Sequence, residues 1–195
     1  MNEWYCCLLC EGSSDAALTN VLELLLTRLT SEPASVSARL DLKGSVQDKL
    51  VALQENDAGL YDLVFVHRDA DNAGLRARQE EIKRVVDSFQ DAAITPVAPV
   101  VPVTMTETWA LASLFGDPDC RDWLRREASV SEKTLEIYRD PKDLLRRLLS
   151  REDPDGKLLP NGVLSVQRAR ILAELDTADG SALSRLTAWT ALNKA

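Results

Sequence analysis

Two aspartates follow a short apolar run near the middle of the chain. Residues 63–66 read Leu-Val-Phe-Val, which is typical of a buried strand, and His67 and Arg68 lead from it to Asp69 and Asp71. In an extended segment, residues i and i+2 point to the same side, so the two carboxylates can converge on one point. Neighbouring carboxylates repel each other unless a cation or a shared proton lies between them. Because Mg²⁺ prefers oxygen ligands and often uses only one or two carboxylates, the pair is a candidate metal site.

The alternative interpretation gives the two aspartates a structural role. Aspartate is common in turns and at the residue before a helix, and a helical pattern follows Gly74. For an isolated Asp-x-Asp sequence this structural role is the more frequent one. The metal hypothesis therefore depends on the elements that surround the pair.

Those elements alternate between strand and helix. Apolar runs and alternation predict strands at residues 3–10, 36–42, 62–67 and 94–103, and helical spacing predicts helices at residues 16–30, 45–56 and 73–89. This order predicts an α/β fold with a mostly parallel four-stranded sheet, right-handed crossovers and helices on both faces. Pro96, Pro99 and Pro102 each remove a backbone donor, which predicts an edge or irregular fourth strand.

The second half of the chain has a helical pattern throughout. The predicted helices span residues 107–115, 119–127, 141–151, 165–175 and 181–192. No Gly/Ser-rich linker precedes them. We therefore expect an α/β core at residues 1–104 and a helical extension at residues 105–195, packed together as one structural unit.

Acidic residues follow three of the four predicted strands. Glu11 follows the first strand, Asp69 and Asp71 follow the third, and Glu107 lies just past the fourth. In an open parallel sheet the carboxyl ends of the strands meet at one edge, where ligands bind. We therefore expect these four carboxylates to share that edge. Asp15 can join them or cap the first helix.

Composition and charge constrain the partners and the compartment. The chain has 195 residues and a formal net charge of −8, so nucleic acid cannot bind through bulk charge and needs divalent cations, a local basic patch or a basic partner subunit. With no apolar run of about 18 residues and no basic N-terminal region, the sequence predicts a cytoplasmic protein without a membrane partner. The four cysteines fit small core residues better than a zinc site, because the only histidine is His67.

Three short motifs resemble a known fold. Residues 11–15 (Glu-Gly-Ser-Ser-Asp) after the first strand and residues 69–71 (Asp-Ala-Asp) after the third resemble the TOPRIM fold, the metal-binding domain of topoisomerases, primases, recombination proteins and OLD-type nucleases. Together with residues 106–112 (Thr-Glu-Thr-Trp-Ala-Leu-Ala), they resemble more narrowly the bacterial domain-of-unknown-function family 4276. That family is TOPRIM-like, and some members occur near mobile-element or phage-defence genes. The TOPRIM resemblance covers residues 3–103, and the narrower one extends through the helical segment.

The resemblance implies a set of metal ligands. The TOPRIM glutamate corresponds to Glu11, and the Asp-x-Asp pair corresponds to Asp69 and Asp71. OLD-type nucleases add one acid near Asp15 and at least one downstream, for which Glu107 is the candidate. The implied cofactor is Mg²⁺ or Mn²⁺.

The sequence departs from the family pattern in two places. His67 and Arg68 put bulky polar groups before the aspartate pair, and no clear counterpart of the catalytic lysine of some nucleases is present. The resemblance therefore supports metal binding better than catalysis. Arg68 is a candidate phosphate contact because it is always charged and bidentate, whereas His67 is expected to pack near the strand end. Ser13 and Ser14 are further candidates for substrate contact, although they lack the Gly-Lys-Ser/Thr ending of a phosphate loop.

The leading prediction is a metal-dependent nuclease from a bacterial phage-defence or mobile-element system. Glu11, Asp69 and Asp71 would hold one ion, and Asp15 and Glu107 would share a second. The metals would activate a water and stabilise the charge that develops on the scissile phosphate. With Arg68 on that phosphate, the candidate catalytic residues are Glu11, Arg68, Asp69, Asp71 and Glu107.

Two alternatives remain open. The first is a non-catalytic TOPRIM-like subunit or regulator, whose acidic pocket is vestigial and whose helical segment docks a partner protein or a second copy of the chain. The second is phosphoryl chemistry on a small nucleotide. A basic groove beside the acids would favour a polymeric substrate, and a closed pocket would favour a small one.

Overall fold

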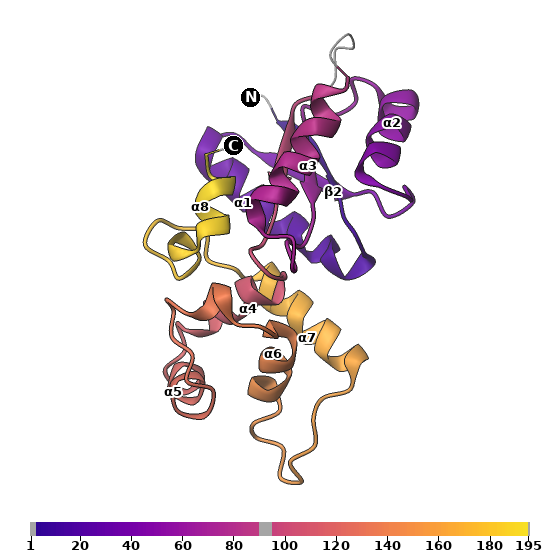
Figure 1. Cartoon of the computed structure of the whole chain (residues 1–195). Helices are drawn as coiled ribbons and strands as arrows, with labels where there is room; N and C mark the ends of the chain where they lie inside the picture. The colour runs from indigo at the N-terminus through magenta and orange to yellow at the C-terminus, as the bar shows by residue number, and fades with distance from the viewer. Residues whose placement is uncertain (1–2, 90–94, 195) are drawn as a thin grey trace.

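The computed structural model describes residues 3–89 and 95–194, and four parallel strands form its centre (Figure 1). These strands are β1 (Trp4–Leu9), β2 (Ala34–Ala38), β3 (Leu63–His67) and β4 (Val97–Val100). Their order in the sheet is β2-β1-β3-β4, and every neighbouring pair is parallel. The predicted fold class, an α/β protein with a parallel sheet flanked by helices, is confirmed.

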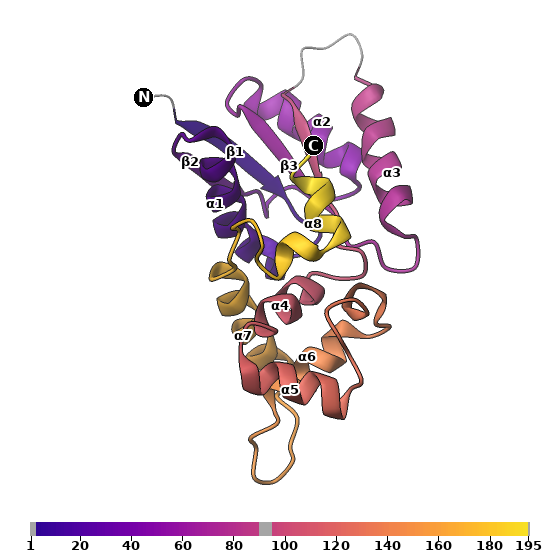
Figure 2. The ribbon, with the colours of Figure 1, turned by 90° about the vertical axis from the view of Figure 1, so that its left-hand side faces the viewer.

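Helices cover both faces of the sheet. The helices that alternate with the strands are α1 (Leu18–Thr30), α2 (Val46–Asp57) and α3 (Leu75–Asp87). Because successive strand residues face opposite sides, β1 contributes to two separate cores. Cys6 and Leu8 belong to the core that contains α1, whereas Cys7 and Leu9 belong to the core that contains α2 and α3. Figures 1 and 2 show α1 on one side of the sheet and α2 and α3 on the other.

The element boundaries differ from the predicted ones mainly at β2, β4 and the first helix. The strand predicted at residues 36–42 spans Ala34–Ala38, and the first helix begins with a 3₁₀ turn, η1 (Ser13–Ala17). The strand predicted at residues 94–103 spans Val97–Val100, and its predicted first residue, Ile94, lies outside the described residues. The strand β4 lies at the edge of the sheet, as its prolines predicted.

The second half of the chain is helical. Its elements are α4 (Glu107–Leu114), α5 (Pro118–Glu127), η2 (Leu135–Ile137), α6 (Pro141–Leu149), α7 (Asn161–Ala173), η3 (Leu183–Arg185) and α8 (Thr187–Leu192). The predicted helix at residues 181–192 is divided into η3 and α8, because the backbone of Leu186 is extended. The helices α4 to α7 lie beyond the carboxyl ends of the strands (Figure 1). No helix within the described ranges is long and apolar enough to span a lipid bilayer.

The helical segment and the sheet share one hydrophobic core. The helix α8 returns to β4 and lies across the face of the sheet that α1 also covers (Figure 2). Trp189 of α8 meets Trp109 of α4 edge to face, with ring centroids 5.3 Å apart, and both side chains are fully buried. The buried residues around them include Leu8 and Phe65 from the strands.

The buried thiols of β1, together with Cys10 directly after it, make the stability of the fold depend on pH in the alkaline range. Burial is the main cause that raises the pKa of Cys7 from 9.0 to about 12 and the pKa of Cys6 and Cys10 to about 11. Above pH 9 the unfolded chain releases thiol protons that the folded chain keeps. Each protonated thiol therefore contributes its full stabilisation below pH 9. Between pH 9 and the pKa of the folded state, the free energy of unfolding falls by about 1.4 kcal/mol per pH unit for each thiol. Denaturant unfolding at pH 8, 9 and 10 measures the free energy of unfolding, which should fall less steeply with pH for Cys7→Ala than for the wild type. An equal fall in the two proteins would contradict the raised pKa of Cys7.

Candidate functional site

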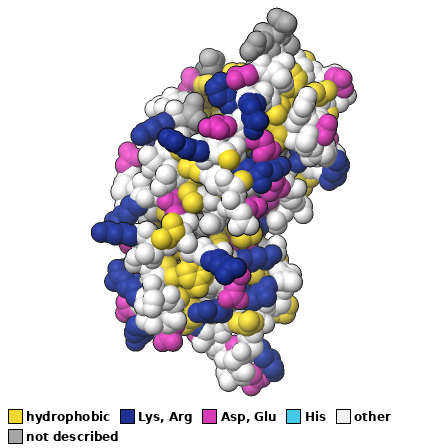
Figure 3. Space-filling view, in the orientation of Figure 1, with side chains coloured by type: hydrophobic (Ala, Val, Ile, Leu, Met, Phe, Trp, Pro, Cys, Tyr) yellow, Lys and Arg dark blue, Asp and Glu magenta, His cyan; other side chains and the backbone are white. Residues whose placement is uncertain are grey.

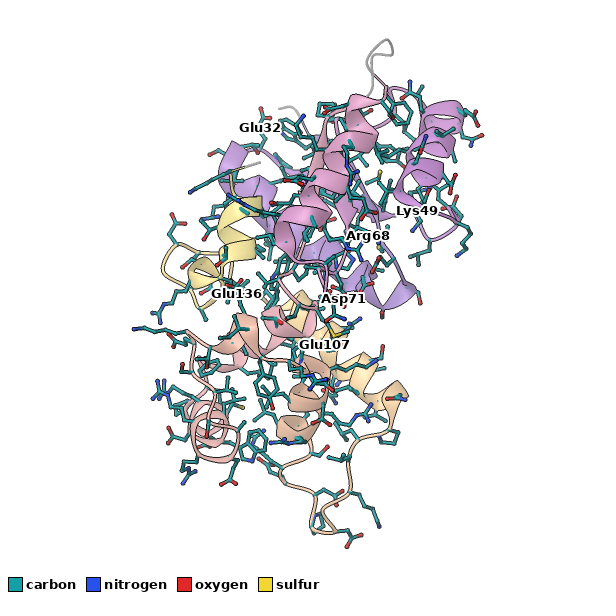
Figure 4. All side chains as sticks on the ribbon, viewed as in Figure 1. Glu32, Lys49, Arg68, Asp71, Glu107 and Glu136 are labelled. Atoms are coloured by element: carbon teal, nitrogen blue, oxygen red, sulfur yellow. The ribbon has the colours of Figure 1, made fainter. Side chains whose placement is uncertain are left out.

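The carboxyl ends of β1, β3 and β4 lie at one edge of the sheet and face α4 and α7. The register aligns Leu9 of β1 with Val66 of β3, and His67 with Val100 of β4. The residues that directly follow these strands therefore meet at this edge. Figure 4 shows Arg68, Asp71 and Glu107 here, between the sheet and the helical segment.

The first aspartate of the pair is held by the start of α4. Oδ1 of Asp69 accepts hydrogen bonds from the backbone N–H of Thr106, at 3.1 Å, and from its hydroxyl, at 3.3 Å. Nε2 of His67 lies 3.1 Å from the same hydroxyl and 3.4 Å from Oδ1 of Asp69. Thr106 and His67 are both buried. The contacts that Asp69 makes to Thr106 and His67 all use Oδ1, and no hydrogen bond among the described residues involves its Oδ2.

Arg168 of α7 lies between two buried carboxylates. Its Nη1 is 2.9 Å from Oε1 of Glu107, and its Nη2 is 3.3 Å from Oδ1 of Asp15. The three side chains are at most 8% exposed. Oδ2 of Asp15 also lies 3.7 Å from Nδ1 of His67, so this cluster continues to the end of β3. A buried carboxylate is strongly unfavourable without a paired charge, and one guanidinium can serve two of them.

Sequence reasoning missed Arg168, although its position carried a signal. Leu164, Arg168 and Leu172 are spaced four residues apart, so they share one face of α7, and all three are buried. An arginine at a position that the pattern assigns to the core requires a buried acidic partner. The partners themselves lie 61 and 153 residues away in sequence.

Arg168 changes the role of two predicted metal ligands. Asp15 and Glu107 were expected to share a second ion, but the guanidinium already supplies the positive charge between them. Oδ2 of Asp15 also accepts a hydrogen bond from the backbone N–H of Gly12, at 3.3 Å, so this residue stabilises the start of η1 as well. The two acids therefore do not fit a second divalent cation in this arrangement.

A small polar void adjoins this buried cluster. Oε2 of Glu107 is buried, and the described part of the chain offers it no hydrogen-bond partner. The void has a volume of about 70 Å³ and is lined by Glu107, Arg168, Ser14, Lys142 and Ser165 among others. It is large and polar enough to hold water.

Four residues at this edge, Glu11, Arg68, Asp69 and Asp71, face solvent at least in part and are called the outer residues. Glu11 and Asp71 are exposed, and Asp69 is partly buried. Nε of Arg68 lies 2.8 Å from Oε1 of Glu11, and its Nη2 lies 3.7 Å from Oε1 of Glu81 in α3. The guanidinium of Arg68 thus lies over the edge of the sheet, between β1 and α3.

The segment after β3 only partly follows the predicted geometry. Ala70 N–H donates to Pro102 O at 3.1 Å, so the pairing with the segment after β4 continues beyond β3. Asp71 has φ 44°, in the left-handed region, so the alternation that predicted its convergence with Asp69 ends before it. Neither aspartate caps α3, because the helix begins after Gly74 without a side-chain cap. The helix-cap part of the structural alternative is therefore wrong, whereas its turn part holds for Asp71, which lies in the turn at residues 71–73.

The oxygen donors at this edge fit a hard cation that keeps part of its water shell. Within residues 3–89 and 95–194, no three His, Cys, Asp or Glu side chains are grouped closely enough to enclose a metal ion. A Mg²⁺ ion that is bound through one or two carboxylates and several waters does not require such a group. Asp69 offers a carboxylate oriented by Thr106, and Glu11 and Asp71 offer exposed ones.

Comparison of the chain with models of protein families, with curated proteins and with solved structures found no match.

Replacing the central guanidinium should destabilise the fold. Arg168→Met leaves Asp15 and Glu107 buried without a paired charge, and we expect a loss of about 3–5 kcal/mol in the free energy of unfolding. Arg170→Met, at an exposed position of the same helix, is the matched control and should have little effect. Urea unfolding measures both variants.

A triple variant separates charge from packing in this prediction. Asp15→Asn and Glu107→Gln added to Arg168→Met remove the uncompensated charges, so part of the stability should return. The explanation fails if Arg168→Met is no less stable than Arg170→Met, or if the triple variant is less stable than Arg168→Met alone.

Proposed function

We propose that this chain is a Mg²⁺- or Mn²⁺-dependent nuclease that cleaves phosphodiester bonds at the carboxyl edge of its sheet. The ion would be held by Glu11, Asp69 and Asp71, with one or two of these carboxylates bound directly and the remainder through its waters. The observation that carries the proposal is the orientation of Asp69: Thr106 binds Oδ1 through two hydrogen bonds, and Oδ2 is left for a ligand. A carboxylate fixed through one oxygen by neighbouring groups is the usual arrangement of a metal ligand.

The charges of the outer residues support a divalent ion. Glu11, Asp69 and Asp71 carry three negative charges, and Arg68, which contacts Glu11, carries one positive charge. The two remaining negative charges match the charge of Mg²⁺ or Mn²⁺. The neighbouring Glu81 does not change this balance, because Arg78 pairs with it at 2.7 Å.

The inner cluster supports the outer residues without contacting a substrate. His67, Asp15, Glu107 and Arg168 are buried, so a polynucleotide cannot reach them in this arrangement. Their contacts hold the segment after β3 and the start of α4 in place, and this fixes the carboxylate of Asp69.

Arg68 is the proposed contact for the scissile phosphate. A bound divalent ion supplies an activated water and stabilises negative charge on the scissile phosphate. The guanidinium of Arg68 is partly exposed, at 22%, and its present partner Glu11 is itself a proposed ligand. With Glu11 as a metal ligand, the guanidinium of Arg68 would keep only its longer contact to Glu81, at 3.7 Å, and could bind two phosphate oxygens.

The resemblance to TOPRIM-like proteins also suggests the biological setting of the proposed nuclease. Within it, the chain would act in a bacterial phage-defence or mobile-element system and would meet nucleic acid through local contacts, since its net charge is −8.

The direct test is cleavage of plasmid, linear DNA and RNA with Mg²⁺ or Mn²⁺. We expect metal-dependent cleavage by the wild type and a loss of at least about 100-fold for Asp69→Asn and for Asp71→Asn, because each removes a charged ligand. Asp122→Asn, at an exposed position of α5, is the control and should cleave like the wild type. Equal cleavage by the Asp69→Asn variant would exclude this site.

Thr106→Val tests the orientation of Asp69 separately. The substitution keeps the backbone N–H bond and the side-chain shape but removes the hydroxyl that contacts Asp69 and His67. We expect Mn²⁺ affinity to fall by about 10–100-fold, measured by calorimetry, while the secondary structure is retained. Unchanged affinity would mean that the hydroxyl does not position the carboxylate.

A further inference from the structure

A basic pocket of about 210 Å³ lies beside Glu11, on the side away from β3. It is formed by the turn after β1, the loop after β2 and the start of α2. Its lining includes Glu11, Ser13, Arg39, Lys43, Gly44 and Lys49. Three of these side chains are cationic, and among the described residues Glu11 is the only acid that lines the pocket.

The positive charge available in this pocket comes from its two lysines. Nζ of Lys43 donates to Leu40 O at 2.7 Å, and Nζ of Lys49 donates to Cys10 O. An ammonium group has three hydrogens, so each lysine retains donors for a ligand after these bonds are made. The bond to Cys10 O also fixes the ammonium of Lys49 next to the turn that carries Glu11.

Arg39 is already neutralised by two acids. It contacts Asp41 at 2.8 Å and also pairs with Asp57, and its guanidinium is the main cause that lowers the pKa of Asp41 to about 2. The arginine therefore shapes the wall of the pocket, and Lys43 and Lys49 supply its charge.

We propose that this pocket binds a phosphate of a polynucleotide strand, next to the phosphate that is cleaved. This inference rests on the proposed function and names the substrate class. Phosphate oxygens are strong acceptors for ammonium groups, and a local basic site is what an acidic chain needs to hold nucleic acid. Because Glu11 lines the pocket and also contacts Arg68, the phosphate would lie beside the proposed metal ligands.

The size of the pocket favours part of a strand over a complete small molecule. Pockets for small ligands have volumes of about 300–1,000 Å³, so about 210 Å³ admits a phosphate with part of its sugar. On the face in Figure 3, basic and acidic side chains are interspersed without an extended basic surface. In Figure 4, Lys49 and Arg68 follow one another toward Asp71 along the edge of the sheet.

The test is binding of a fluorescein-labelled oligothymidylate of six nucleotides, measured by anisotropy in EDTA at several salt concentrations. The variant is Lys43→Ala with Lys49→Gln, and the control is Lys83→Ala with Lys133→Ala, which removes the same charge away from the pocket. We expect the double variant to bind at least about 10-fold more weakly, and the slope of log affinity against log salt to fall by about 2, one for each lysine. The control should bind like the wild type.

Two competition experiments identify the class of ligand. Thymidine monophosphate and inorganic phosphate should compete much more weakly than unlabelled oligothymidylate, because a strand also contacts the neighbouring edge. Competition by the mononucleotide equal to that of the strand would overturn the polynucleotide assignment. Equal binding by the lysine variant and its control, or no binding by the wild type, would overturn the pocket as a phosphate site.

Failure of this inference is distinguishable from failure of the proposed function. The binding assay contains no metal, so it does not depend on the ion site. Cleavage that is lost in Asp69→Asn, together with strand binding that ignores the lysines, would overturn the pocket alone. Thermal unfolding followed by circular dichroism checks that Lys49→Gln folds like the wild type.

Discussion

The ion pairs of Arg168 with Asp15 and Glu107 connect the two halves of this protein. Three charged side chains are buried at the junction between the carboxyl edge of the sheet and the helices α4 and α7. Burying an ion costs several kcal/mol unless it is paired with good geometry, so the helical segment can dock only where these partners meet. That docking places Thr106 at the end of β3, where it holds Asp69. The orientation of Asp69 therefore depends on Arg168, a residue that does not contact it.

This arrangement divides the acids of the edge into two groups. Asp15 and Glu107 are buried and paired with a cation that belongs to the chain, whereas Glu11, Asp69 and Asp71 face solvent at least in part. The division gives the two groups different physical roles. The inner group fixes the structure, and the outer group keeps a negative charge that a divalent ion can balance. Adjacent to it, Lys43 and Lys49 bring positive charge to a chain whose overall charge repels nucleic acid.

Much of the fold was predictable, because the spacing of the apolar residues and the order of strands and helices along the chain determine it. Apolar runs separated by helices require a parallel sheet, and a parallel sheet brings Glu11, Asp69 and Glu107 to one edge. The prolines of the fourth strand correctly indicated an edge strand. The fold class thus follows from local patterns with few alternatives.

The contacts of the candidate site were less predictable, for physical reasons. The partners of Arg168 come from segments that are distant in sequence, and an arginine on a helix does not reveal which acid it meets. The left-handed backbone of Asp71 occurs together with a hydrogen bond from its N–H to Thr104 O, a residue 33 positions away that no local pattern indicates. The second strand was predicted too long at its end, because Leu40 and Leu42 continue the alternation. In the structure these residues follow the strand and line the basic pocket.

The number of divalent ions bound per chain tests the central claim most directly. Isothermal calorimetry with Mn²⁺ measures it on the intact protein. We predict one ion per chain, because the outer carboxylates are available and Arg168 already occupies the place between Asp15 and Glu107. Two ions per chain would show that the guanidinium gives way to metal, and no binding would show that the outer carboxylates do not form a metal site. Either result would contradict the account.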